Sequence, residues 1–239
     1  MTPYVLVHGA SCYGAMFTEL KTELTPFGYD VHTPTTHGNR PGAYVAVSLQ
    51  QSIDSIVEYL VENDLSDVIL AGHSWGGMVI TGVAEKAPER IRRLVYWNAM
   101  VPNDGESLID LLPPHMVTMF EAIAAGSTDG SVGFPPTVLR EAFMNCGSAE
   151  QYAAIKVVPQ SYATMTDKIT LSQNPAALEI GKSYINSTED TALPHSHGWH
   201  PRMSEKLGLF RLVQIPGDHM GFATDPKGVA KALHMAGRD

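Results

Sequence analysis

The chain has 239 residues, of which 44% are hydrophobic and 17% charged, a composition that excludes a disordered protein and suits one domain with a single core. Sixteen Lys and Arg residues against 25 Asp and Glu residues give a formal net charge of −9 at pH 7. This negative charge argues against nucleic acid or an acidic membrane as a partner and favours a small-molecule ligand.

Short β-branched segments alternate along the chain with longer amphipathic ones, which is typical of βαβ units and a parallel sheet covered by helices. The predicted strands, in chain order, are residues 4–7, 30–34, 67–71, 94–97, 182–186 and 210–215. The predicted helices are residues 15–24, 49–63, 76–86, 201–207 and 227–235. The fold class is therefore α/β, with a mostly parallel sheet of about six strands.

The first residues give an expectation about the compartment. Residues 1–10 contain no Lys or Arg, and their apolar run is too short for a signal peptide or a membrane span. We therefore expect a cytoplasmic protein that does not insert into a membrane. Cys12 and Cys146 are expected to be free thiols in that reducing compartment.

The stretch of residues 103–171 separates two predicted strands and is much longer than one crossover needs. It contains two Pro-Pro pairs, a Gly-rich stretch and several short apolar helical segments. A complete βαβ unit needs only about 30 residues. We predict that residues 1–239 form a single domain and that residues 103–171 are a helical cap inserted into it, over the carboxyl edge of the sheet.

Residues 72–76 read Gly-His-Ser-Trp-Gly and stand between an apolar predicted strand and a predicted helix. This is the G-x-S-x-G pattern of a nucleophile elbow, in which glycines permit a sharp turn that holds the serine hydroxyl at the end of the strand. Ser74 is therefore the predicted nucleophile. A Gly-rich turn without a catalytic role is the alternative, and the strand–turn–helix context disfavours it.

Acyl transfer also needs N–H donors for the oxyanion. The residue after the nucleophile normally supplies one donor, and the loop after the first strand supplies another. These positions are Trp75 and, within the His-Gly-Ala-Ser-Cys loop of residues 8–12, Ala10. We predict an oxyanion hole made by these two backbone N–H groups, with an ordinary βα turn as the alternative for the loop.

A serine hydroxyl needs a base to remove its proton, and the base needs an acid to orient it. His219 follows the last predicted strand, and the chain order serine, acid, histidine then places the acid near Asp190. Asp190 is the predicted acid. Glu189 beside it and Asp104 after the fourth strand are the alternatives.

The histidines at 195, 197 and 200 resemble a metal cluster, but their spacing fits no ligand pattern and no cysteine or carboxylate set accompanies them. We expect no metal and no organic cofactor.

We expect the substrate pocket to be formed by the cap and by the loop of residues 8–12, which we call the first loop. We predict contacts from Ser11, Cys12, Tyr13, Met100 and Met220. Methionine and aromatic side chains supply adaptable apolar surface in the cap, although each of them can equally serve to pack the cap onto the sheet. Those residues are Met116, Met119, Phe120, Phe134, Phe143, Met144, Tyr162 and Met165.

With these motifs in place, the sequence resembles the plant methyl esterase and hydroxynitrile lyase branch of the α/β-hydrolase superfamily, together with its bacterial esterase relatives. The resemblance rests on residues 5–10, 72–78, 187–190 and 217–220, and on Pro194. We call residues 187–190, which contain the predicted acid, the acid loop. It implies an α/β-hydrolase fold and a serine esterase, and it allows a homodimer that no residue demands.

Within that branch, the lyases carry a threonine in the oxyanion loop and a lysine directly after the catalytic histidine. Gly9 and Met220 stand at those places here. The resemblance therefore implies hydrolysis of a small or aromatic carboxylic ester. Carbamate or amide hydrolysis, hydroxynitrile lyase chemistry, cofactor-free dioxygenation and a non-catalytic ligand receptor are the alternatives on the same scaffold.

Overall fold

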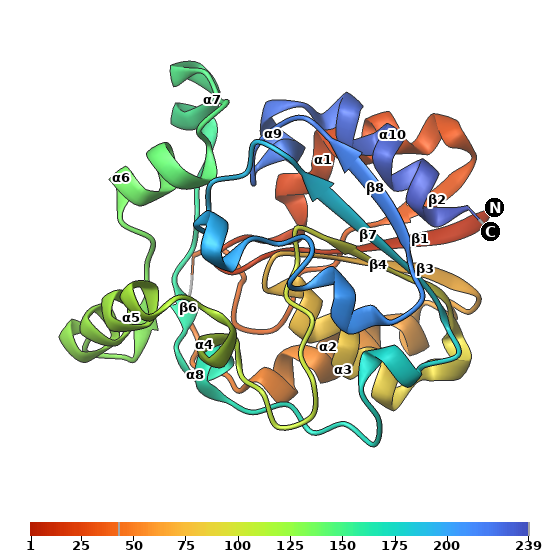
Figure 1. Cartoon of the computed structure of the whole chain (residues 1–239), viewed down its shortest axis with the longest axis horizontal. Helices are drawn as coiled ribbons and strands as arrows, with labels where there is room; N and C mark the ends of the chain where they lie inside the picture. Colours follow the sequence, from red (N-terminus) through yellow and green to blue (C-terminus); the bar gives the residue numbers. More distant parts are fainter. Residues whose placement is uncertain (43, 239) are drawn as a thin grey trace.

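A parallel sheet of six strands forms the centre of the protein, which we describe from a computed structural model that covers residues 1–42 and 44–238 (Figure 1). The strand order is β2-β1-β3-β4-β7-β8, and every neighbouring pair is parallel. The strands are β1 (Thr2–Val7), β2 (Tyr29–His32), β3 (Val68–His73), β4 (Ile91–Trp97), β7 (Gly181–Ser187) and β8 (Arg211–Ile215). The predicted fold class is confirmed, with strand ends shifted by up to three residues.

Helices cover both faces of this sheet, which is why its central strands β1, β3, β4 and β7 are largely buried. Helices α1 (Thr18–Leu24) and α10 (Pro226–Gly237) pack together on one face, and α2 (Leu49–Glu62) and α3 (Gly76–Lys86) on the other (Figure 1). All six residues of β3 are buried between these layers. The hydrophobic core therefore fixes the strand whose end carries the serine.

Two predicted helices differ from the structure in kind. The segment expected to be helical from residue 15 begins as a 3₁₀ turn, Gly14–Phe17, before α1. The segment expected at residues 201–207 contains only a 3₁₀ turn, Ser204–Leu207. Residues 200–203 precede this turn without forming a helix, and Gly208 ends it with a φ of 68° that favours glycine.

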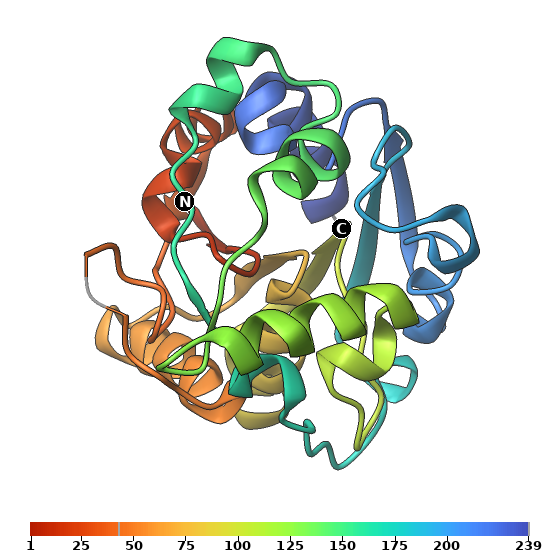
Figure 2. The same cartoon turned by 90° about the vertical axis from the view of Figure 1, so that its left-hand side faces the viewer.

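The stretch between β4 and β7 is broken into short elements that lie together beside the carboxyl edge of the sheet (Figures 1 and 2). Its helices are α4 (Leu108–Leu111), α5 (Pro114–Gly126), α6 (Pro136–Val138), a π-helical turn at Leu139–Phe143, α7 (Ala149–Ala154) and α8 (Ala163–Thr166). Strands β5 (Ser131–Val132) and β6 (Gln160–Ser161) pair antiparallel within it. We call residues 103–171 the cap.

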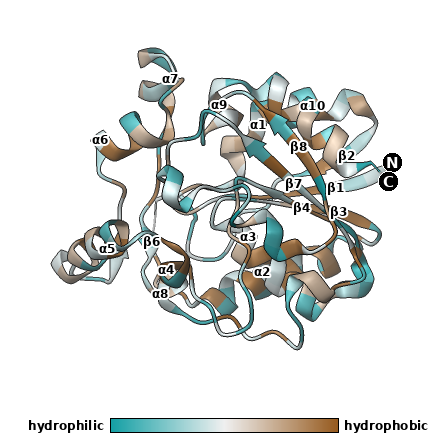
Figure 3. Ribbon diagram, viewed as in Figure 1, coloured by the Kyte–Doolittle hydropathy of each residue, from teal (hydrophilic) through white to brown (hydrophobic). Residues whose placement is uncertain are grey.

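Hydrophobic residues are concentrated in the sheet layers and also on cap helix α5 (Figure 3). Met116 and Phe120 of this helix are buried, so its apolar side faces the interior. A last short helix, α9 (Gly221–Thr224), follows β8. Within the described part of the chain, no helix is long and apolar enough to cross a bilayer.

Candidate active site

Ser74 lies in a strained turn between β3 and α3. Its φ is 57°, a left-handed conformation that is uncommon for serine. A Cβ at Gly72 would lie 2.5 Å from the carbonyl oxygen of Gly76, and one at Gly76 would lie 2.7 Å from the carbonyl oxygen of His8. Only glycine fits both places. The turn therefore holds the partly exposed Ser74 beside the first loop, as the elbow pattern predicts.

His219 is hydrogen-bonded to Asp190 in the interior. His219 Nδ1 lies 2.6 Å from Asp190 Oδ2, and the two side chains are 2% and 0% exposed. Because a carboxylate only accepts, the imidazole proton resides on Nδ1 and Nε2 is left as a base. The other carboxylate oxygen accepts from the backbone N–H of Ala192 at 2.8 Å. Asn98 Nδ2 also donates to Asp190 Oδ2.

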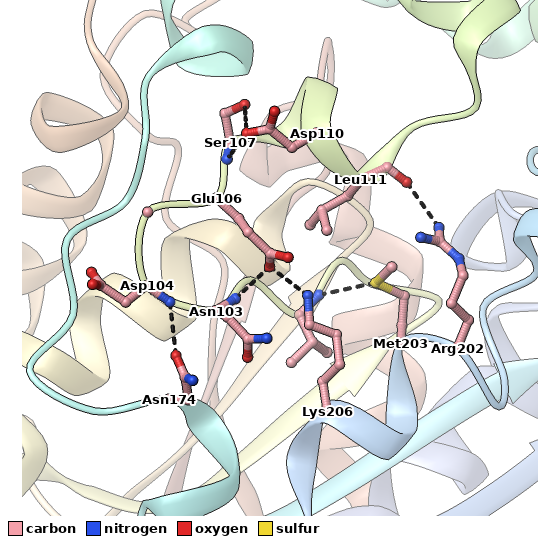
Figure 4. Close-up of polar contacts among 12 residues, drawn as sticks. Asn103, Asp104, Glu106, Ser107, Asp110, Leu111, Asn174, Arg202, Met203 and Lys206 are labelled. Carbon is pink, nitrogen blue, oxygen red and sulfur yellow. Dashed lines mark hydrogen bonds and ion pairs between the residues drawn. The ribbon is translucent and has the colours of Figure 1, made fainter.

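Asp104, one alternative for the acid, is engaged elsewhere. Its carboxylate accepts from the backbone N–H of Leu171 at 2.8 Å. Its own N–H donates to Asn174 Oδ1 at 2.8 Å (Figure 4). The Asp104 side chain is exposed. It therefore fastens the start of the cap to its end and makes no contact with His219.

Glu189, the other alternative, is also held away from the imidazole. Its carboxylate accepts from the backbone N–H of Gly217 at 2.7 Å and lies 3.6 Å from Cys146 Sγ. Glu189 thus joins the acid loop to the loop before His219. Of the three candidate acids, the structure brings only Asp190 to the histidine.

Two adjoining cavities meet at Ser74 and His219, which line both of them. No side-chain hydrogen bond involving Ser74 Oγ exists among residues 1–42 and 44–238. Hydrogen bonds between a nucleophile and its base are often long before substrate binds, so the absence of a hydrogen bond from Ser74 Oγ does not argue against catalysis. The larger of the two cavities contains about 360 Å³ of empty space, a volume that includes space open to solvent.

The larger cavity is almost entirely apolar. Besides the serine and histidine it is lined by Ala10, Trp75, Met100, Leu108, Leu112, Met116, Phe120, Phe134, Phe143, Met165, Ala192, Leu193 and Trp199. The smaller one adds Gly9, Cys12, His73, Leu139, Val157 and Met220. An apolar, uncharged substrate suits such a lining.

The predicted oxyanion donors both reach the larger cavity. In the described part of the chain, the backbone N–H groups of Ala10 and Trp75 have no acceptor. Both residues line the cavity beside Ser74. Free N–H groups next to a nucleophile are the arrangement that stabilises a tetrahedral oxyanion.

The predicted pocket residues divide into two groups. Met100 lines the larger cavity, and Cys12 and Met220 line the smaller one. Ser11 and Tyr13 line neither of these two cavities. Ser11 is fully buried, with its N–H bonded to Gln160 in the cap, and Tyr13 lines a separate groove on the outside.

Among the predicted cap residues, Met116, Phe120, Phe134, Phe143 and Met165 line the larger cavity. Met119, Met144 and Tyr162 line neither cavity and serve packing instead, which was the alternative for each of them.

Trp199 is the main site residue that the sequence did not reveal. Its ring is stacked on the imidazole of His219, with centroids 5.2 Å apart and planes 15° apart, and it lines the larger cavity. It lies in the segment whose three histidines resemble a metal cluster. Among the described residues no group of three His, Cys, Asp or Glu side chains is arranged to hold a metal.

Polar contacts connect residues 199–206, which we call the Trp199 segment, to the cap (Figure 4). Lys206 Nζ lies 2.5 Å from Glu106 Oε2, and Arg202 donates to the carbonyl oxygen of Leu111 at 2.8 Å. Leu108 and Leu112 of the cap line the cavity together with Trp199. These contacts therefore fix the position of the cavity wall that contains Trp199 relative to the wall that contains Leu108 and Leu112.

The two other histidines near Ser74 are neutral. Burial, and then electrostatic repulsion from the neighbouring His219 ring, hold the pKa of His73 well below its usual value. The Nε2–H of His73 donates to the carbonyl oxygen of His219 at 2.8 Å. Burial lowers the pKa of His8 to about 4, and its Nε2 accepts from the N–H of Thr36. These two side chains are structural.

Comparison with known proteins gives a consistent picture. A model of the alpha/beta hydrolase family matches residues 4–232. The chain is 30% identical to the carbendazim hydrolyzing esterase of Nocardioides sp., covering 99% of this chain and 100% of that one. It is 25% identical to the pyrethroid hydrolase of Sphingobium wenxiniae, covering 98% and 86%.

Among solved structures, the fold matches an extracellular alpha/beta-hydrolase from a Paenibacillus species with a TM-score of 0.95, at 35% identity and over 100% of both chains. That protein is described as sharing structural and functional homology with tobacco salicylic acid binding protein 2.

Proposed function

Since the chain belongs to the alpha/beta hydrolase family, we propose that it hydrolyses a small or aromatic carboxylic ester through a Ser74–His219–Asp190 triad and an acyl-enzyme. The observation that carries this proposal is the 2.6 Å pairing of His219 Nδ1 with Asp190 Oδ2 beside two cavities that Ser74 also lines. A base oriented by a buried carboxylate next to a serine on an elbow is suited to acyl transfer.

In the proposed reaction, His219 Nε2 takes the proton of Ser74 Oγ as this oxygen attacks the ester carbonyl. The tetrahedral oxyanion is bound by the N–H groups of Ala10 and Trp75. His219 then protonates the departing alkoxide, which leaves an acyl-serine. Water, deprotonated by the same imidazole, releases the carboxylic acid and returns the enzyme to its starting state.

The lining of the cavities supports an uncharged substrate with apolar groups on both sides of the scissile bond. A charged acyl or alcohol group would lose its hydration in the larger cavity and find no opposite charge there. We therefore place neutral aliphatic and aromatic esters ahead of amino-acid or phosphate-bearing ones. Carbamates, with a similar carbonyl, are the nearest alternative substrates.

Location and assembly stay predictions. We propose a cytoplasmic location for this protein, whereas the Paenibacillus relative is described as extracellular. The homodimer likewise stays a prediction.

The test is hydrolysis of p-nitrophenyl esters, aryl methyl esters, carbendazim and a pyrethroid by the wild type and by Ser74→Ala. A fluorophosphonate probe, followed to its modified residue, identifies the nucleophile. We expect turnover that Ser74→Ala abolishes and a label on Ser74, whereas Ser172→Ala, an exposed serine outside the site, stays fully active. Turnover retained by Ser74→Ala, or an unlabelled wild type without turnover, would overturn the proposal.

A further inference from the structure

A segment of the cap contacts the surroundings of both free N–H groups. Residues 160–164, which span β6 and the start of α8 (Figure 1), are separated from the first loop by about 150 positions of chain. Gln160 Oε1 accepts a hydrogen bond of 2.8 Å from the backbone N–H of Ser11, the neighbour of Ala10. Thr164 accepts a hydrogen bond of 3.2 Å on its carbonyl oxygen from Trp75 Nε1.

The two contacts are joined to each other inside the cap. Gln160 Nε2 donates to Thr164 Oγ1 at 2.6 Å, and this hydroxyl donates to the carbonyl oxygen of Ser161 at 2.7 Å. Gln160 is 1% exposed and Thr164 is 0% exposed. Hydrogen bonds in such a buried network are strong, and a member that loses its partner is costly. The 160–164 segment therefore has one well-defined arrangement.

The first loop needs support from outside because its conformation is strained. Ser11 has a φ of 59°, in the left-handed region that serine seldom adopts. Its carbonyl oxygen accepts from the N–H of Val158 in the cap at 2.9 Å, and Asn39 Nδ2 bridges Gln160 Oε1 and the carbonyl oxygen of Cys12. Both peptide groups of Ser11, the residue after Ala10, are thus bonded to the cap.

We propose that the 160–164 segment positions the oxyanion hole, with Gln160 fixing the loop that presents the Ala10 N–H and Thr164 fixing the Trp75 side. The proposal rests on the proposed esterase function and deepens it. The cap then has two roles. It lines the substrate cavity, and through the 160–164 segment it positions the N–H groups of Ala10 and Trp75. Gln160 and Thr164 are positioning residues, because they act on substrate through Ala10 and Trp75.

The test compares Gln160→Met with wild type on a p-nitrophenyl ester. Methionine has a similar length, and it replaces the carbonyl oxygen that accepts from Ser11 and Asn39 with a sulfur that is only a weak acceptor. An oxyanion is formed only in the transition state, so a displaced donor lowers kcat and leaves KM unchanged. We expect kcat to fall roughly tenfold or more, towards the ~100-fold that loss of a whole donor costs, with KM within about threefold.

A second readout is specific to the oxyanion. An aryl trifluoromethyl ketone forms a tetrahedral adduct with the serine, and its inhibition constant should rise in proportion to the fall in kcat/KM. The carboxylic acid product forms no such adduct, so its inhibition constant should stay unchanged. A variant that merely loosened the fold would move both constants or neither.

Gln151→Met is the matched control. Gln151 also joins the cap to the rest of the protein, through hydrogen bonds of 3.1 Å to the carbonyl oxygens of Ala223 and Thr224, and it does not contact the first loop. We expect this variant to keep wild-type kcat and ketone binding. Equal behaviour of Gln160→Met and Gln151→Met would overturn the inference while leaving the esterase proposal intact.

Thr164→Val provides the answer if Gln160→Met does not fold. Valine keeps the shape of the side chain and removes the oxygen that accepts from Gln160 Nε2. A several-fold lower kcat with the same selective loss of ketone binding is expected, and wild-type values would overturn the inference. Absence of turnover in the wild-type enzyme would instead refute the esterase proposal.

Discussion

The side-chain amide of Asn98 donates to the same carboxylate oxygen of Asp190 that accepts from His219. Asn98 is fully buried, and its own carbonyl oxygen accepts from the N–H of Ser187 at 2.7 Å. Its φ of 37° lies in the left-handed region, which asparagine tolerates better than most residues. Asn98 therefore joins the end of β4 to the acid loop after β7 and holds Asp190 as an acceptor.

Asn98→Asp should replace this donor with a second carboxyl group in nearly the same volume. Two carboxylates in one buried site cannot both ionise readily, so the pair retains a proton to higher pH than a lone carboxyl group would. We expect kcat/KM to fall by at least about tenfold at pH 7, because Asp190 no longer presents a dependable acceptor to His219. The measurement is the pH profile of ester hydrolysis for both proteins.

Stability should change in the same variant with a defined sign. The raised pKa of the carboxyl pair means that the folded state binds more protons than the unfolded state above about pH 4, so stability falls as the pH rises. Urea unfolding should show a larger deficit against wild type at pH 8 than at pH 5. A deficit that is independent of pH would contradict this role of Asn98.

Asp190→Asn should identify the acid among the three candidates. An asparagine there cannot hold the imidazole with its proton on Nδ1, and in a triad this costs about 10⁴ in kcat. Asp104→Asn and Glu189→Gln, which alter carboxylates bonded to Leu171 and Gly217, should stay within about threefold in kcat since such exposed changes are mild. A large loss in either of these and not in Asp190→Asn would contradict the assignment.

The positions of the candidate nucleophile and of the candidate oxyanion donors could be read from the sequence because their signals are local. A G-x-S-x-G pattern between a strand and a helix specifies Ser74 and Trp75 by position, and chain order then points to His219. The parallel sheet was predictable for a related reason, since the buried run of β3 and the amphipathic pattern of α2 each lie within one element.

Asn98, Gln160 and Trp199 were not predictable by the same reasoning. Asn98 meets Asp190 across 92 positions and Gln160 meets Ser11 across 149, and neither residue type carries a motif of its own. Trp199 stacks on His219 from a segment without regular helix or strand. Such contacts arise from how the cap and loops pack, which no periodicity encodes. The positions of Ser11 and Tyr13 outside the two cavities have the same origin, because the direction of a loop is set by the residues that it contacts.

Asp218→Asn should become relatively more favourable as the pH rises. Burial raises the pKa of Asp218, although its carboxylate accepts from the N–H of Cys146 at 3.0 Å and from Thr224 Oγ1 at 2.8 Å. A carboxyl group with a raised folded pKa loses stabilising effect as the pH rises above its unfolded value of about 3.9. An asparagine can keep contact with both neighbours without carrying a charge.

We therefore expect the free energy of unfolding of Asp218→Asn, relative to wild type, to increase between about pH 4 and pH 7. Urea denaturation at several pH values measures this directly. Asp225→Asn is the matched control, since that carboxylate caps α10 from a more exposed position through the N–H of Gly228. A relative stability of Asp218→Asn that falls with rising pH would show that burial does not raise the pKa of this carboxyl group.

Trp199→Leu should impair catalysis more than Trp199→Phe. The indole lies parallel to the His219 ring and closes one side of the larger cavity, so it restricts the imidazole and excludes water from it. Phenylalanine keeps an aromatic face for the imidazolium that forms during acylation, and a ring–cation contact contributes about 0.5–2 kcal/mol. Leucine fills much of the space and offers no such face.

For Trp199→Leu, the loss of that contact corresponds to a fall in kcat of roughly 2- to 30-fold, and Trp199→Phe should retain most of the activity. Trp97→Phe controls for the loss of a buried indole that lies beneath the site against His73 rather than in the cavity. Steady-state kinetics on one small and one aromatic ester separates the two roles of Trp199. A fall in kcat on both esters indicates support of His219, and a rise in KM confined to the aromatic ester would show that Trp199 acts only as a wall of the pocket.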